Sequence, residues 1–298
     1  MSNRSRPSGP GLAFGGTLAL ASALGIGRFV YTPILPVMAA ALALGKAQAG
    51  LIASANFAGY LAGALLAGVP GLPGGRRIWF LGALLIGAVT TLAMALPDGM
   101  GWFLLLRFIG GTASAFVLVL GSALVLDRLA AAGRGGLAAL HFAGVGLGIA
   151  VSAVLVDGLL AEGAGWRGLW LAAGVASGLA VPFAAWLVPP LPETDAPAAA
   201  EGKGRLPPGL GTLSICHGLF GFGYVVTATF LVAVIRSDPN LRALETVAWL
   251  AVGLAAIPST AAWGWAGRRF GVLPAYAVAC LIEALGVAAG GLWATPAA

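Results

Sequence analysis

Nine apolar segments of roughly membrane-spanning length divide this sequence, and they constrain the fold more than any other feature. A helix that crosses the bilayer core needs about 20 predominantly apolar residues. We expect helices at residues 12–41, 47–69, 78–97, 102–126, 136–160, 167–188, 209–235, 244–266 and 272–295. Only 9% of the residues are charged, whereas a soluble domain carries about 25%. The sequence therefore predicts an all-α integral membrane protein.

Lysine and arginine are distributed unevenly between alternate loops of this arrangement. If the N-terminus is cytoplasmic, the inside segments hold Arg4, Arg6, Arg76, Arg77, Arg128, Arg134, Lys203, Arg205, Arg268 and Arg269. The outside segments hold Lys46, Arg167, Arg236 and Arg242. Because basic residues collect in cytoplasmic loops, we expect the N-terminus to lie inside. The net charge of +6 then reflects membrane topology, and it does not indicate a nucleic-acid partner.

A polar segment separates the first six predicted spans from the last three. Residues 188–209 combine charged side chains with several prolines and a run of alanines, a composition typical of a linker. We expect residues 1–188 to form an N-terminal six-helix bundle and residues 189–208 to form a cytoplasmic linker. Residues 209–298 then form a partial C-terminal bundle of three helices.

An internal repeat relates the two parts of the chain. Gly25-Ile-Gly-Arg28-Phe-Val30 aligns with Gly221-Phe-Gly-Tyr224-Val-Val226, and Gly75-Arg76-Arg77 aligns with Gly267-Arg268-Arg269. These stretches, with Gly25–Pro36 as a whole and Gly165-Trp-Arg167, resemble the YbfB/YjiJ-type transporters of the major facilitator superfamily. The resemblance implies that superfamily's fold of two six-helix bundles, of which this sequence contains the first bundle and three helices of the second. A full-length member has three more helices, so we expect the 298-residue chain to be unstable or inactive as a monomer.

The resemblance also implies a function. Members of this superfamily move small organic solutes by alternating access, and we expect such a secondary transporter in a bacterial inner membrane. The sequence contains no ATP-binding motif that would supply energy instead. Arg107 belongs to an Arg107-x-x-x-Gly111 motif that the family links to proton coupling, which favours protons as the coupling ion.

Gating and coupling mode follow from the same resemblance. The basic loops expected to gate the inside contain Arg76, Arg77, Arg268 and Arg269. The aspartate usual in the first of these loops is absent, which puts the family's charge relay at that loop in question. The 136–160 span has glycines but no Gly-Pro pair, so symport or uniport is favoured over antiport.

Arg28 lies in the middle of the first apolar segment. A guanidinium at bilayer depth costs about 3 kcal/mol on insertion scales, so it must face protein, water or a ligand. Neighbouring glycines and prolines between Gly25 and Pro36 loosen the helix at this point, which is tolerated only beside a cavity or packed neighbours. Arg28 therefore indicates a translocation pathway, and a purely structural hydrogen-bonding role is the alternative.

Arg107 lies at a similar expected depth. Counting 1.5 Å per residue places both arginines roughly 8–15 Å below the outer surface. Two guanidiniums facing one cavity would bind a carboxylate or another anion through paired hydrogen bonds. The alternative for Arg107 is that its long side chain extends to the nearby membrane interface.

Three titratable side chains are candidates for proton coupling together with Arg107. His141 and His217 are the only histidines, and Glu283 lies in the middle of the last span. A histidine is a natural proton carrier near neutral pH, but it can equally hydrogen-bond a neighbouring helix. Glu283 could likewise be neutral and structural. The cavity helices hold no carboxylate at mid-membrane depth, which favours protons over sodium.

The remaining candidates are cavity residues. Aromatic and small polar side chains on the helices that line the cavity in this superfamily are Tyr31, Thr32, Asn56, Tyr60, Tyr224, Thr227 and Trp249. Such groups suit an apolar pocket with a few orienting contacts. We expect no cofactor, metal or catalytic residue. Two other functions stay open: a membrane-embedded transferase, and a truncated protein that does not transport. The oligomeric state is not predicted.

Overall fold

The computed structural model describes residues 9–69, 72–96, 99–190 and 209–293, and this part of the chain is helical without a strand. The elements are α1 (Gly9–Leu20), η1 (Ala21–Ile26), α2 (Tyr31–Leu42), α3 (Lys46–Ala67), α4 (Arg76–Ala93), α5 (Met100–Ala131), η2 (Gly135–Leu137), α6 (Ala138–Ala161), α7 (Trp166–Leu187), α8 (Leu210–Ser237), η4 (Arg242–Leu244), α9 (Glu245–Phe270) and α10 (Val272–Trp293). Because α1, η1 and α2 form one apolar stretch, the described residues contain nine helices able to cross a membrane. The predicted helical membrane fold is confirmed.

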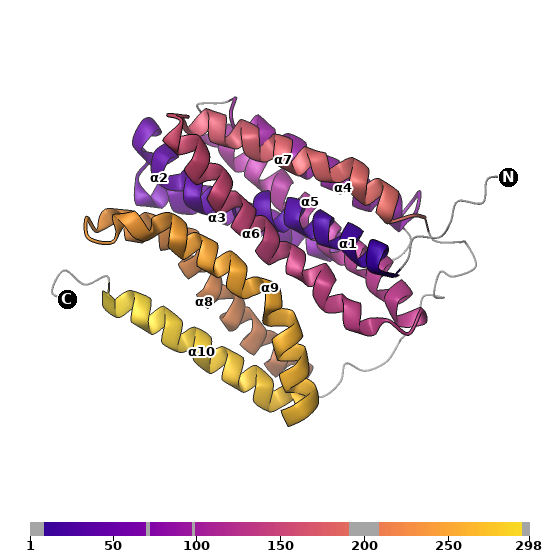
Figure 1. The fold of residues 1–298 in the computed structure, drawn as a ribbon. Coiled ribbons are helices and arrows are strands. Elements are labelled where there is room, and N and C mark those ends of the chain that lie inside the picture. Colours follow the sequence, from indigo (N-terminus) through magenta and orange to yellow (C-terminus); the bar gives the residue numbers. More distant parts are fainter. Residues whose placement is uncertain (1–8, 70–71, 97–98, 191–208, 294–298) are drawn as a thin grey trace.

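The first six spans pack against one another (Figure 1). Helix α5 lies between α3 and α4, α4 also contacts α7, and α1 packs on α6 and α7. Large side chains fill this interior, and Phe80, Phe103 and Trp170 are completely buried. Segment η1 of the first span contacts α4, α5, α6 and α7 of this bundle. The first span therefore passes through the interior of the bundle.

Helices α8, α9 and α10 form a second group beside this bundle. They meet it mainly where α9 packs along α6 and where α8 packs on α2. Little of their surface is covered: 11% of the most apolar stretch of α8 or α9 is buried, against 89% for the first span. The second group therefore touches the first through two helix pairs and otherwise presents apolar side chains outward.

Glycines allow helices of the first bundle to approach at backbone distance. A Cβ atom on Gly59 of α3 would collide with the carbonyl oxygen of Phe108 on α5. Gly25 and Gly148 face each other in the same way between η1 and α6. Small residues at helix contacts are the usual means of association in lipid, where helices gain nothing from excluding water.

The first span is interrupted where the sequence predicts a loosened helix. The amide of Gly27 donates to the Ser22 carbonyl over 2.8 Å, and the amide of Phe29 donates to the Leu24 carbonyl over 3.2 Å. Both bonds reach back five residues, which makes η1 a π-helical segment. A short turn over residues 27–30 follows before α2 begins.

Two sequence predictions fall on residues outside the described ranges. The first is the cytoplasmic linker, because residues 191–208 contain nearly all of it. The second is part of the charge distribution that predicts the topology, because Arg4, Arg6, Lys203 and Arg205 lie outside the described ranges.

Candidate functional site

Arg107 holds the interrupted first span in place. It projects from α5, and its two terminal guanidinium nitrogens donate to the carbonyl oxygens of Gly27 and Arg28, each over 3.0 Å. These carbonyls follow the π-helical segment, where the regular helical bonding has ended. Only 4% of the Arg107 surface is exposed. The side chain thus lies inside the bundle and does not extend toward a membrane interface.

Aromatic rings and an amide complete the surroundings of Arg107. Its guanidinium carbon lies 5.2 Å from the ring centre of Tyr31 and 5.8 Å from that of Trp170. On the backbone side, the Asn56 amide of α3 donates to the Arg107 carbonyl over 3.0 Å. The Arg107 Nε atom has no hydrogen-bond partner. Arg107 therefore joins the α5 helix, the α3 helix and the broken first span.

Arg28 lies against aromatic rings instead of a counter-ion. Its guanidinium carbon is 4.5 Å from the ring centre of Phe57 and 4.4 Å from that of Tyr60, both on α3. Phe29 contributes a third ring at 5.4 Å. Arg28 is 7% exposed, its Nε atom has no hydrogen-bond partner, and it pairs with no carboxylate among the described residues.

The two arginines are neighbours in the fold, because the Arg107 guanidinium donates to the Arg28 carbonyl oxygen. Arg28 also interacts with the phenol groups of Tyr60 and of Tyr224, the latter on α8. The site therefore combines two buried positive charges, aromatic rings from α3, and one side chain from the second group of helices. Such an arrangement leaves positive charge uncompensated at the boundary between the two helix groups, where an anion would be stabilised.

Several predicted cavity residues are occupied by hydrogen bonds within the protein. The Tyr31 hydroxyl donates to the Ala49 carbonyl over 2.9 Å, and the Thr227 hydroxyl donates to the Gly223 carbonyl of its own helix. Thr32 donates to the Ala228 carbonyl of α8 over 2.9 Å. Tyr31 and Thr227 are thus held within their own helix group, while Thr32 joins the two groups.

Trp249 is buried at the contact between α9 and α6. Its indole nitrogen donates to the Ser152 hydroxyl over 3.0 Å, and its ring lies 6.4 Å from that of Phe29. Sequence reasoning placed Trp249 among the cavity residues but did not identify Ser152 as its partner. Ser152 lies on the face of α6 turned toward α9, and only the packing of the two helices shows this.

The proton-coupling candidates do not form one cluster. His141 of α6 is fully buried, and its Nε2 atom lies 3.2 Å from the Ser122 hydroxyl of α5. The other ring nitrogen has no partner and faces Gly16 of α1. His141 is therefore enclosed by α1, α5 and α6. It contacts the first span before η1, whereas Arg28 lies after η1.

His217 and Glu283 lie in the second group of helices. The His217 ring stacks on Phe220, with ring centres 6.1 Å apart, and also approaches Tyr276 of α10. Glu283 of α10 points toward Gly223 of α8, and its buried Oε1 atom has no partner. These two residues belong to the α8–α10 contact, and the first bundle does not cover them.

The basic residues expected in gating loops have different surroundings. Arg77 donates from Nε to the Val188 carbonyl over 2.7 Å and from a terminal nitrogen to the Ala185 carbonyl over 2.6 Å. It thereby satisfies free carbonyls at the end of α7. Arg76, Arg268 and Arg269 are exposed. The structure does not bring these four residues together.

Phe57 is a site residue that sequence reasoning missed. A signal was present: Phe57 and Tyr60 are three residues apart, so on a helix their rings share one face. Both contact the same guanidinium. Residue spacing alone did not indicate which helix would present a charge to that face.

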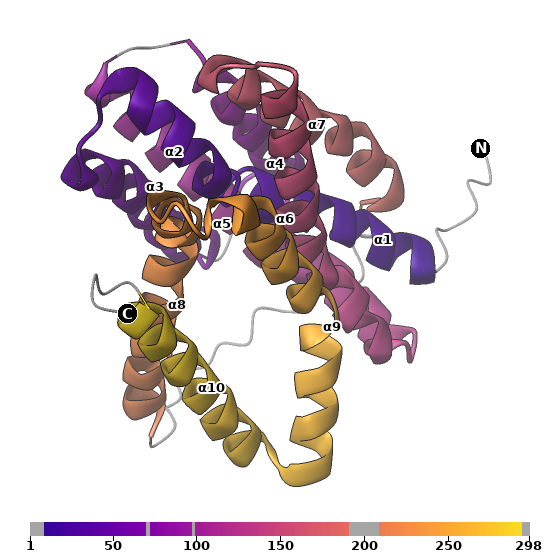
Figure 2. The same ribbon diagram turned by 60° about the vertical axis from the view of Figure 1, so that its left-hand side comes forward.

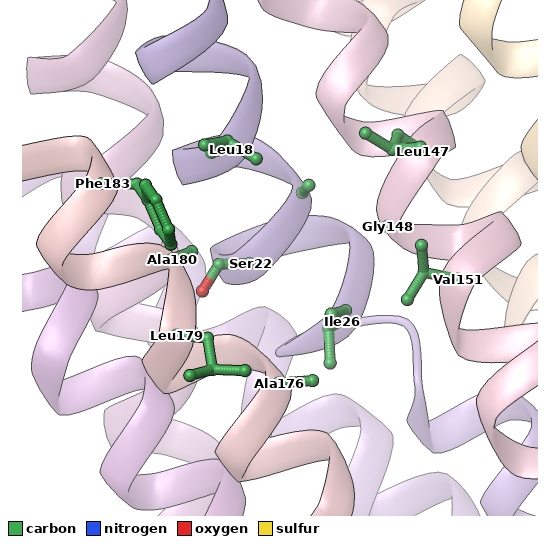
Figure 3. A pocket seen from close by; sticks show the side chains of 11 residues that line it. Leu18, Ser22, Ile26, Leu147, Gly148, Val151, Ala176, Leu179, Ala180 and Phe183 are labelled. Atoms are coloured by element: carbon green, nitrogen blue, oxygen red, sulfur yellow. The ribbon is translucent and has the colours of Figure 1, made fainter. Parts of the chain in front are cut away.

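An apolar pocket of about 230 Å³ lies between α1 with η1, α6 and α7 (Figure 3). Its only hydroxyl group belongs to Ser22, which donates to the Ser177 carbonyl over 3.0 Å. Leu179 and Phe183 at its edge are exposed. None of the charged candidates lines it, so it is separate from the Arg28 site.

The described residues form a helical membrane protein whose first span is interrupted just before Arg28. The structure is similar to the crystal structure of the nucleoside transporter NupG (D323A mutant), with a TM-score of 0.61. The sequence identity is 17%, and the similarity covers 87% of this chain and 69% of that one. No curated protein matches the sequence.

The model of a particular family matches residues 20–298 and is described as "Uncharacterised MFS-type transporter YbfB". The chain belongs to this YbfB family of the major facilitator superfamily. The predicted family is thereby confirmed.

Proposed function

We propose that this membrane transporter is secondary active and moves a small organic anion by alternating access. The observation that carries the proposal is Arg28, a buried guanidinium without a carboxylate partner among the described residues. A charge in this position is costly, and natural proteins keep it where it has a function. A substrate carboxylate would supply the missing negative charge.

The surroundings of Arg28 support recognition of a planar anionic group. Phe57 and Tyr60 contact the guanidinium at 4.5 and 4.4 Å, so its edge remains the part able to form hydrogen bonds. A guanidinium edge matches a carboxylate with two parallel hydrogen bonds, which a lysine ammonium cannot reproduce. Tyr60 and Tyr224 offer hydroxyl groups from opposite sides of the boundary between the helix groups.

Protons are the coupling ion in this proposal. His141, His217 and Glu283 are the groups that could exchange a proton, with Arg107 as the residue that the family motif links to coupling. The Nδ1 atom of His141 and the Oε1 atom of Glu283 are buried without a hydrogen-bond partner. A buried polar atom of this kind calls for an explanation, and a role in proton exchange supplies one.

The proposed topology places the N-terminus in the cytoplasm of a bacterial cell and the protein in its inner membrane. The distribution of basic residues supports it, with Arg76, Arg77, Arg268 and Arg269 on the inside. In this orientation the contact of Asp157 on α6 with Thr246 on α9 lies at the outer side. The chain is then organised as an N-terminal bundle (residues 1–188), a cytoplasmic linker (189–208) and a partial C-terminal bundle (209–298).

The test is uptake by proteoliposomes from a panel of labelled carboxylates, sugars and nucleosides, with and without an imposed pH gradient. Nucleosides are included because the similar solved structure is a nucleoside transporter. We expect a carboxylate to be taken up, and Arg28→Ala and Arg28→Lys to lower its apparent affinity at least tenfold. The matched control is Arg242→Ala, which removes a charge from an exposed position between α8 and α9.

Three results would count against the proposal. Uptake of uncharged solutes alone would exclude the anion role of Arg28. Uptake driven by a sodium gradient at fixed pH would exclude proton coupling. If no solute in the panel is transported although the protein is folded, the alternatives of a non-transporting protein and of a membrane-embedded transferase are favoured.

A further inference from the structure

The contact between α6 and α9 has two parts of different chemistry. In its middle, backbones touch: a Cβ atom on Gly146 would lie 2.6 Å from the Gly253 carbonyl oxygen, and one on Gly253 would lie 2.5 Å from the Ala150 amide nitrogen. Toward one end, side chains form hydrogen bonds instead. Ser152 accepts from Trp249, and the Asp157 carboxylate accepts from the Thr246 hydroxyl over 2.6 Å.

The course of α9 separates the touching part from a diverging part. Close contact with α6 extends to Ile257, whose amide nitrogen lies within 2.7 Å of a Cβ atom on Gly146. Pro258 follows inside the helix. The C-terminal part of α9 bends away from α6 toward α10 (Figure 2). A proline inside a helix removes one backbone hydrogen bond and is a usual cause of such a bend.

We propose that Asp157–Thr246 and Ser152–Trp249 form a releasable latch, and that the contact of Gly146 and Ala150 with Gly253 is the pivot about which the latch opens. In the topology proposed above, the latch closes the outer side of the transporter in this structure. The inference rests on alternating access, and it assigns the residues that hold one of its two states.

Geometry supports the division into pivot and latch. Glycine backbones form a smooth contact without interlocking side chains, so two helices can rotate there with little loss of packing. Thr246 lies seven residues from Gly253, about 10 Å along the helix. A rigid-body rotation of about 15°, the size seen in other switching proteins, would move Thr246 by about 3 Å. That displacement breaks the Asp157–Thr246 hydrogen bond and leaves the pivot in contact.

A buried cluster under the latch would become accessible when it opens. Four spans contribute to it: Phe29 comes from the first span, Ile149 and Ala153 from α6, Val232 from α8 and Trp249 from α9. Val232 of α8 is 3% exposed. Its burial depends on the neighbouring group of helices, so a cysteine there reports whether this side is closed.

The experiment measures the accessibility of a single cysteine in the full 298-residue chain in intact cells. The two native cysteines, Cys216 and Cys280, are replaced by alanine, and Val232→Cys is added as the reporter. A membrane-impermeant maleimide is then applied from outside. We expect slow labelling in this parent, and a labelling rate at least about fivefold higher when Thr246→Val and Trp249→Phe remove both hydrogen bonds.

Two comparisons make the test specific. Thr260→Val and Trp263→Phe make the same chemical changes on α9 beyond Pro258, and they should leave the rate unchanged. Asp157→Asn keeps an acceptor oxygen for Thr246 and should stay near the parent rate. Thr246→Val alone, checked for monodisperse elution, should give an intermediate rate if the double variant folds poorly.

An unchanged rate in the latch variants would overturn the proposal, as would an equal rise in the Thr260→Val, Trp263→Phe control. The labelling requires no substrate, so its outcome is independent of whether the transported solute is an anion.

Discussion

The guanidinium of Arg107 donates a hydrogen bond to the carbonyl oxygen of Arg28 over 3.0 Å, so one buried arginine fixes the backbone that presents the other. A second bond from Arg107 holds the Gly27 carbonyl. Arg107 and Arg28 are therefore not equivalent cavity groups. Arg107 positions the interrupted span, while Arg28 keeps hydrogen-bonding capacity unused.

Replacing Arg107 should destabilise the protein more than replacing Arg28. Arg107→Met leaves the Gly27 and Arg28 carbonyls without donors in a buried site, at a cost of roughly 2–4 kcal/mol. Arg28→Met removes a buried charge that lacks a carboxylate partner, so its effect on stability should be small or favourable. Thermal unfolding of the two purified variants in detergent measures the difference. Equal melting temperatures would contradict the positioning role of Arg107.

Glycines in the contact of α3 with α5 should not tolerate even a methyl group. Gly59→Ala places a Cβ atom against the Phe108 carbonyl, and Gly111→Ala places one against the Asn56 carbonyl. Each should cost about 1–3 kcal/mol because backbones must separate. Gly82→Ala and Gly101→Ala, whose added Cβ atoms would contact nothing within 4 Å, serve as controls in the same thermal assay. Those two should be neutral or slightly stabilising, since alanine favours a helix.

Arg77→Ala should loosen the end of α7, because the Ala185 and Val188 carbonyls lose their donors. We expect a loss of about 1–3 kcal/mol, whereas Arg76→Ala at the neighbouring exposed position should be nearly neutral. A second readout is the decrease in melting temperature caused by Arg77→Ala, measured at low and at high salt. A loss that disappears in high salt would indicate a surface charge effect instead of these backbone bonds.

Phe57→Leu should weaken the hold on Arg28 while keeping an apolar side chain on α3. The lost contact between ring and guanidinium amounts to about 1–2 kcal/mol in a desolvated site. Thermal unfolding of Phe57→Leu, Arg28→Met and the double variant gives the coupling energy between the two residues. Additive effects would mean that the ring and the charge act independently.

The break in the first span and the charge beside it could be predicted from the sequence. Glycine and proline loosen a helix, and an arginine stands out in an apolar segment. The nine spans could also be predicted, since apolar length depends on composition alone. The partners of Arg107 could not be found in this way. Its hydrogen bonds go to backbone carbonyls of Gly27 and Arg28, and every residue carries a carbonyl, so no residue type marks them.

The direction in which each helix turns its side chains was the other missing information. Trp249 and Thr32 were expected to line a cavity, and both form hydrogen bonds between the two helix groups. The rotation of a helix about its axis is set by packing, which spacing predicts only when one face is clearly polar. Here both faces of α6 are apolar or glycine-rich, so the sequence does not distinguish them.

The π-helical segment η1 also changes the phase of the first span. A turn of this kind holds one residue more than a regular α-helical turn, and each residue in a helix corresponds to a rotation of about 100°. Residues before η1, such as Gly16, face α6, whereas Arg28 after it reaches the rings of α3. If Ala21–Ile26 were wound as a regular α-helix of the same length, Arg28 would be turned by roughly 100°, away from Phe57 and Tyr60. Deleting a single residue within this segment would instead let regular winding replace the π-helical turn and would keep Arg28 facing the two rings.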